Sequence, residues 1–182
     1  RLRPVIERQI SLRNRNNRLR STWLARMKWI ESEDDSFWDE AEEESSTTIR
    51  PTIPQWEYIY TKAQFPAFVA GFGAGKTEAA ILRCIFGLIA NPTCNRGFYE
   101  PTYDLIRMIA WPRFEAVLNE LKLPYKLTKS PQNQIHIEGY GTIFFRSMDN
   151  ATRIIGYEHA DADIDELDTL KQEDAAYVWR QI

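Results

Sequence analysis

Seven consecutive residues, Gly71–Thr77, have the composition of a loop that binds phosphate: Gly-Phe-Gly-Ala-Gly-Lys-Thr. Glycine allows the backbone to curl until successive N–H groups point at one anion. A helix predicted to begin near Lys76 would add the positive end of its dipole. The Lys76 ammonium can neutralise the outer phosphates of a nucleotide, and the Thr77 hydroxyl can bind Mg²⁺. The predicted nucleotide-binding residues of this loop are Gly71, Gly73, Ala74, Gly75, Lys76 and Thr77.

The sequence on either side of this loop gives it the context that such a motif requires. The apolar run Phe65–Ala70 precedes it and is predicted to be a strand. Lys76–Ala90 follows with helical periodicity, and Asn91 and Pro92 are expected to stop that helix. One position departs from the usual pattern, because Ala70 stands where the first glycine of the motif is expected. Alanine is small, but its backbone angles are more restricted than those of glycine.

Two adjacent acids, Asp165 and Glu166, would supply the second half of a nucleotide-hydrolysing site. They follow a short predicted strand, residues 161–164, so Asp165 at its carboxyl end can hold the shell of a Mg²⁺ ion. Glu166 can polarise a water molecule for in-line attack on the terminal phosphate. We therefore expect ATP and Mg²⁺ as cofactors, Thr77 and Asp165 as metal ligands, and Lys76 and Glu166 as catalytic residues.

Asp161 and Asp163 are unusual in this strand, because a central parallel strand buried on both faces is normally apolar throughout. The sequence leaves two explanations open. Either both acids lie near an end of the strand, or they have charged partners elsewhere in the chain.

Gln55 precedes the phosphate loop within the segment Pro51-Thr52-Ile53-Pro54-Gln55-Trp56. A glutamine amide carries one donor and one acceptor group, so it can match N6 and N7 of adenine. We predict that Gln55 binds the base of the nucleotide. The alternative is a surface glutamine at the start of a helix.

The other predicted elements alternate between strands and helices, which is typical of an α/β fold with right-handed crossovers and a largely parallel, twisted sheet covered by helices on both faces. Together with the phosphate loop, this order predicts a P-loop NTPase fold. Strands are predicted at 97–99, 134–137, 142–145 and 161–164, the middle two as a hairpin, and helices at 76–90, 103–121 (kinked or restarted at Pro112), 150–156 and 170–179.

The first part of the chain differs in character, and we expect an appendage at 1–48 and the ATPase domain at 49–182. Residues 1–30 hold nine Lys and Arg against one Glu, whereas residues 31–44 hold nine acids and no base. Residues 18–30 have the periodicity of a short amphipathic helix. These blocks are either solvated surface, a contact for DNA or an acidic partner, or a pair in which the acids mask the bases. No apolar run approaches the roughly 18 residues of a membrane-spanning helix, so we expect no membrane partner.

Taken together, residues 50–182 resemble the large terminase subunit of tailed phages. The resemblance rests on Pro54-Gln55 as the adenine motif, Gly71–Thr77 as Walker A, and Asp165-Glu166 as Walker B with the catalytic glutamate. Two further stretches look like the family. They are Tyr99-Glu100-Pro101-Thr102-Tyr103 with Trp111-Pro112-Arg113-Phe114, and Phe145-Arg146-Ser147-Met148-Asp149-Asn150 followed by Arg153 and Gly156.

This resemblance implies a subunit of a homo-oligomeric ring on the capsid portal that uses ATP to pump double-stranded DNA. It implies the portal protein and the small terminase subunit as partners, and a location in the host cytoplasm and transiently on the procapsid portal. We expect the ATPase domain to be incomplete at its C-terminus and the family's nuclease domain to be absent. Many relatives carry an arginine where this chain has Phe72, so Arg146, Arg153 or an arginine of a neighbouring subunit would stabilise the charge of the transition state.

Two other functions stay open from the sequence. A superfamily-two DNA helicase shares the glutamine, the phosphate loop and the acidic pair. A docking fragment that does not hydrolyse ATP is the second alternative, with the charged appendage as its contact for a small subunit or portal.

Overall fold

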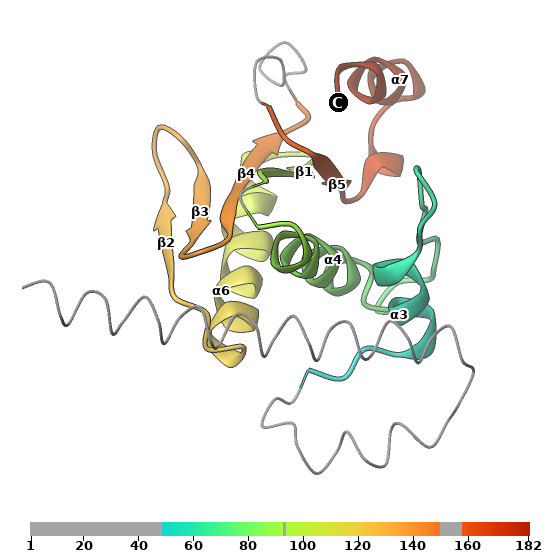
Figure 1. Ribbon diagram of the computed structural model, residues 1–182. Helices are drawn as coiled ribbons and strands as arrows, with labels where there is room; N and C mark the ends of the chain where they lie inside the picture. The colour runs from blue at the N-terminus through green and yellow to red at the C-terminus, as the bar shows by residue number, and fades with distance from the viewer. Residues whose placement is uncertain (1–48, 93, 150–157) are drawn as a thin grey trace, which may run out of the picture. The chain divides into compact units, whose positions relative to one another are not determined.

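A five-stranded sheet is the centre of the computed structural model, which describes residues 49–92, 94–149 and 158–182 (Figure 1). The chain from Pro51 to Ile182 forms one compact unit. The predicted appendage at 1–48, with its helix at 18–30, and the helix predicted at 150–156 lie outside the described residues.

The sheet has the strand order β2-β3-β4-β1-β5 and is mixed (Figure 1). β1 lies between β4 and β5 and runs parallel to both, whereas β2, β3 and β4 are joined by antiparallel pairing. The α/β fold class is confirmed, and so is the hairpin, which is formed by β3 and β4. The strands are β1 (Arg96–Glu100), β2 (Tyr125–Thr128), β3 (Gln134–Ile137), β4 (Gly141–Ser147) and β5 (Asp161–Ile164).

Side chains of β1 alternate between the two faces of the sheet, and helices cover both faces. Phe98 packs edge-to-face on Phe114 of α6 (Trp111–Glu120), with 5.0 Å between the ring centroids. Tyr99 points to the opposite face and forms a buried cluster with Val178 of α7 (Gln172–Gln181). The same face as Phe98 is covered by α4, which contacts β1, β5 and α6.

Helix α4 (Lys76–Ala90) begins and ends where the sequence predicts. Three contacts fix its direction: Arg83 pairs with Asp163 of β5, Gly87 lies against the Arg96 guanidinium, and Leu88 contacts Gly141. Arg96 and Gly141 are the first residues of β1 and β4. The second half of α4 therefore lies over the amino ends of these strands, and its first turn faces their carboxyl ends.

The strand predicted over 65–70 is wrong. This run pairs with no strand of the described chain, and Phe65 and Val69 are exposed. A strand depends on hydrogen bonds from a neighbour, and an apolar composition alone does not supply them. β2 was not predicted, because a run of only four residues is too short for its pattern to distinguish a strand from a loop.

The helix predicted at 103–121 is interrupted before Pro112. It consists of α5 (Tyr103–Leu105), a π-helical turn at Ile106–Ala110 and α6. Proline lacks the N–H that would bond to the carbonyl four residues back, so the regular α-helical pattern is broken in the turn before Pro112. A preceding helix, α3 (Ile53–Tyr60), and a short 3₁₀ turn at Leu167–Thr169 complete the elements of the described residues. No helix among the described residues is both long and apolar enough to span a bilayer.

Candidate nucleotide-binding site

The phosphate loop adopts backbone angles that require glycine at two of its positions. Gly73 and Gly75 have φ of 77° and 73°, in the left-handed region. A Cβ atom at Gly73 would meet nothing within 4 Å, so this part of the loop faces open space, whereas a Cβ atom at Gly75 would collide with Gln55 Nε2. Ala70 is not among the described residues with positive φ. The departure from the usual glycine at position 70 therefore causes no backbone strain here.

Lys76 closes the loop from the first turn of α4. Its ammonium donates hydrogen bonds to the carbonyl oxygens of Ala70 (3.0 Å) and Gly71 (3.2 Å). The positive charge of Lys76 is thus held beside the first residues of the loop and the N-terminal end of a fifteen-residue helix. Thr77, the next residue, is half-buried in the same turn.

The acidic pair lies directly after β5, at the carboxyl edge of the parallel strands. The backbone N–H of Asp165 donates to the Tyr99 carbonyl (2.9 Å), which extends the pairing of β5 with β1 by one residue. One carboxylate oxygen of Asp165 accepts the Glu166 N–H (3.1 Å). Because α4 points its first turn toward this edge, the structure brings the phosphate loop and the acidic pair to the same side of the sheet.

Glu166 has a left-handed backbone, with φ 51° and ψ 36°. This conformation costs a residue with a Cβ atom about 1 kcal/mol. The turn after Glu166 holds it, since the Glu166 carbonyl accepts hydrogen bonds from the Thr169 N–H (3.1 Å) and hydroxyl (2.8 Å). The side chain of Glu166 is exposed, so it is accessible to a water molecule and a substrate. Strained residues of this kind are concentrated at functional sites.

Glu100, which the sequence analysis did not select, lies beside this pair at the end of β1. Tyr99 pairs with Ile164, so Glu100 and Asp165 are the next residues of the two strands. Burial raises the pKa of Glu100 to about 8, and the negative charges of Asp165 and Glu166 add to the effect. A carboxylate at the end of an apolar strand was the signal in the sequence that could have identified it.

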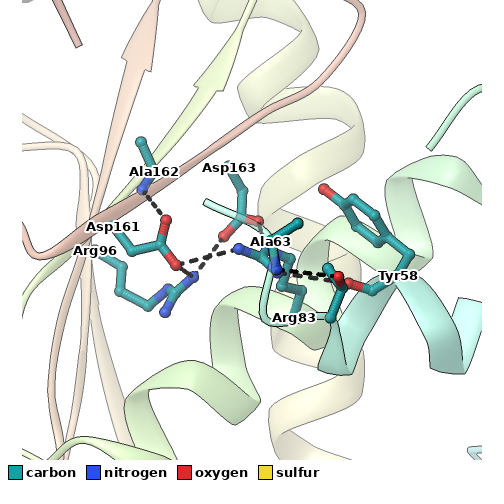
Figure 2. A network of polar contacts seen from close by, with 8 residues as sticks. Tyr58, Ala63, Arg83, Arg96, Asp161, Ala162 and Asp163 are labelled. Atoms are coloured by element: carbon teal, nitrogen blue, oxygen red, sulfur yellow. Dashed lines mark hydrogen bonds and ion pairs between the residues drawn. The ribbon is translucent and has the colours of Figure 1, made fainter. Parts of the chain in front are cut away.

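A network of two arginines and two aspartates joins α4 to β1 and β5 (Figure 2). Arg96 lies 2.6 Å from Asp161 and 3.3 Å from Asp163, and Arg83 lies 3.2 Å from Asp163 and 3.4 Å from Asp161. The side chain of Asp163 is 1% exposed. Both acids therefore have charged partners, and Asp161 in addition lies at the first position of β5, so both explanations apply to Asp161 and the second applies to the buried Asp163. The Arg83–Asp163 pair fixes β5 against α4, the helix that follows the phosphate loop. Asp165 lies two residues after Asp163, so the same pair helps to position Asp165.

Gln55 is buried in the first turn of α3 and contacts the phosphate loop. Its side-chain Nε2 donates to the Gly75 carbonyl (3.0 Å), and its Oε1 accepts the Thr52 N–H (2.7 Å). Gln55 therefore lies at a helix start, as the alternative interpretation assumed, but it is not on the surface. Oε1 also accepts the Thr52 hydroxyl (3.2 Å), so accepting a hydrogen bond from an adenine would require Oε1 to exchange one of its two bonds from Thr52. Base recognition by Gln55 stays a prediction.

The arginines predicted to stabilise the transition state are not brought to this edge by the described chain. Arg146 is on the face of the sheet that Tyr99 occupies, opposite to α4, and it donates to the carbonyls of Gln132 (2.8 Å) and Phe145 (2.6 Å). Arg153 lies outside the described residues. Arg113 of α6 does reach the first turn of α4, where its Nε and Nη2 atoms donate to the two oxygens of the Glu78 carboxylate.

The fold is similar to that of solved large terminases. The large terminase of a thermophilic bacteriophage matches with a TM-score of 0.56 and 13% identity, over 73% of this chain and 36% of that chain. The same terminase in complex with ADP gives 0.57 and 14%, over 72% and 36%. The ATPase domain of the Thermus phage P74-26 large terminase gives 0.59 and 17%, over 81% of this chain and 64% of that one.

These identities are low, so the likeness shows the fold. No family model matches the sequence, and no curated protein is similar to it. The chain spans about a third of the length of the first two terminase structures. It has a terminase-like ATPase-domain fold, in which a loop suited to phosphate and three carboxyl groups share one edge of the sheet.

Proposed function

We propose that this chain binds and hydrolyses ATP with Mg²⁺ and forms the motor part of a large terminase subunit. The observation that carries this proposal is the direction of α4, which faces its phosphate loop toward the carboxyl edge where Asp165 and Glu166 lie. A phosphate loop and an acidic pair at one edge of a parallel sheet is the arrangement that nucleotide hydrolysis requires. The phage terminase solved with ADP supports an adenine nucleotide as the ligand.

The residues at this edge suit a magnesium-bound triphosphate. Open space in front of Gly71 and Gly73 leaves room for phosphate oxygens near the loop backbone. Mg²⁺ usually takes only one or two protein ligands and keeps several water molecules. Thr77 and Asp165 would be those ligands. When bound, the ion would neutralise charge on the phosphates.

Each protein group has a defined task in this proposal. Lys76 would exchange the carbonyls of Ala70 and Gly71 for phosphate oxygens. Glu166, exposed and held by its turn, would orient the attacking water and accept its proton. Gln55 donates to the Gly75 carbonyl, so a change in the loop backbone when a nucleotide binds would be transmitted to α3 through this hydrogen bond.

The motor role goes further than hydrolysis. We propose that hydrolysis drives double-stranded DNA into a procapsid, from a ring of copies on the portal protein, in the host cytoplasm and together with the small terminase subunit. An arginine from a neighbouring copy is the candidate for stabilising the transition state, because Arg146 is engaged on the opposite face of the sheet.

Two measurements test this proposal. Lys76→Ala should lose at least about a hundredfold in ATP turnover, since it removes the charge that faces the phosphates. Lys126→Ala, an exposed lysine on β2 at the other end of the sheet, is the matched control and should hydrolyse normally. Equal turnover in both variants would refute the site. Turnover that portal and DNA do not stimulate in the wild type would refute the packaging role and leave hydrolysis intact.

A further inference from the structure

We propose that Glu100 is a third carboxyl group of the hydrolysis site, where it accepts hydrogen bonds from the water molecules around the Mg²⁺ ion of the bound nucleotide. This inference rests on the proposed ATPase function and adds a metal-positioning residue to it. Four features of the structure support it: position, direction, burial and the lack of a side-chain partner among the described residues.

Position and direction follow from the strand pairing. β1 and β5 are parallel, so their carboxyl ends meet at the same edge, where Glu100 ends β1 and Asp165 follows β5. Side chains alternate along a strand. Glu100 therefore shares a face with Phe98, and Asp165 shares that face with Asp163, which contacts α4. Both carboxyl groups are directed to the side on which the phosphate loop begins α4.

The Glu100 side chain is buried and has no polar partner among the described residues. Glu100 is 2% exposed. Its backbone carbonyl accepts the Met148 N–H (2.8 Å), but the side-chain carboxyl makes no hydrogen bond or ion pair with the described residues. The charged groups that act on it are Asp165 and Glu166, which are themselves acidic. A carboxyl group in such a place is destabilising unless a proton or a cation accompanies it.

Asp163 provides an internal comparison on the neighbouring strand. It is as deeply buried as Glu100, and two arginines neutralise it. The described chain thus supplies counter-charges to Asp163, which lies within β5, and none to Glu100, which lies at the carboxyl end of β1. A divalent cation held between the phosphate loop and Asp165 would be the missing counter-charge.

The ion's water shell is the expected contact, rather than the ion itself. The described residues include no group of three side chains placed to coordinate one metal directly. Mg²⁺ gives up its water molecules reluctantly. Loss of a side chain that orients the water molecules and ligands around a metal ion typically lowers the protein's affinity for that ion by roughly 10–100-fold.

The test measures metal affinity rather than turnover. A fluorescent, non-hydrolysable ATP analogue is titrated with Mg²⁺ in the presence of the wild-type chain and of Glu100→Gln, which keeps the shape and removes the charge. Glu173→Gln, an exposed glutamate on α7, is the matched control. For Glu100→Gln we expect the Mg²⁺ concentration at half-saturation to rise about tenfold. Analogue binding in EDTA should stay unchanged. Glu100→Asp keeps a carboxylate and should shift less than Glu100→Gln.

The outcomes separate this inference from the proposed function. An unchanged Mg²⁺ requirement in Glu100→Gln overturns the inference. So does an equal loss of binding with Mg²⁺ and with EDTA, because that loss would indicate a role in packing. If the wild-type chain binds no analogue even with Mg²⁺, the proposed ATPase function fails, and this inference fails with it.

Discussion

The burial of Glu100 predicts how the stability of the protein depends on pH. The pKa of Glu100 rises from 4.5 to about 8 on folding, chiefly because burial disfavours the charged form. The folded state therefore binds this proton more tightly than the unfolded state. The resulting stabilisation is complete below pH 4.5 and is lost as the pH rises to about 8. Glu100→Gln removes this titration, so the two proteins should respond differently to pH.

The size of the effect follows from the difference between the two pKa values. Each pH unit within this window changes the free energy of unfolding by at most about 1.4 kcal/mol, and the whole window corresponds to at most about 5 kcal/mol. Water enters and side chains rearrange around a new charge, so we expect about half of this, roughly 2–3 kcal/mol. The stability of Glu100→Gln relative to the wild type should grow by that amount between pH 5 and pH 8.5.

Urea unfolding followed by tryptophan fluorescence measures this difference. Both proteins are unfolded at pH 5, 6, 7, 8 and 9 in EDTA, so that no metal ion compensates the charge. All other titrating groups are common to the two proteins and cancel in the comparison. Any pH-independent cost of burying the Gln amide appears as a constant offset. A difference in free energy that does not change between pH 5 and pH 9 would refute the reasoning, because Glu100 would then titrate as a solvated carboxyl.

Two other sites give predictions of defined direction. Glu166→Gln should bind ATP but lose about a hundredfold or more in turnover, measured by phosphate release, and near-normal turnover would remove Glu166 as the base. Glu166→Gly should resist urea better than Glu166→Ala by about 1 kcal/mol, since glycine adopts the observed φ of 51° without strain; equal stabilities would contradict the strain. Asp163→Ala should destabilise the fold by about 3 kcal/mol, because it removes the deeply buried carboxylate that faces both guanidinium groups and leaves them only the half-exposed Asp161. The half-exposed Asp161 is the control, and Asp161→Ala should cost less.

The sequence determined the features that depend on neighbours along the chain. Helical periodicity and the Asn-Pro stop located α4 from Lys76 to Ala90, and β5 was located at 161–164. The glycines of the phosphate loop were recognised for the backbone freedom that Gly73 and Gly75 require. In each case the information lies within a few residues, as turn angles and helix ends are set locally.

The tertiary structure alone decided which distant residues meet. Strand pairing placed Glu100 beside Asp165 and Arg96 beside Asp161, and the packing of α4 brought Arg83 to Asp163. The alternation of side chains along β4 put Arg146 on the face opposite to α4. Residues 65–70 have the composition of a strand but pair with no strand of the described chain. Which strands pair, and which face of the sheet a side chain occupies, depend on hydrogen bonds and contacts between segments far apart in the chain. No local pattern specifies those partners.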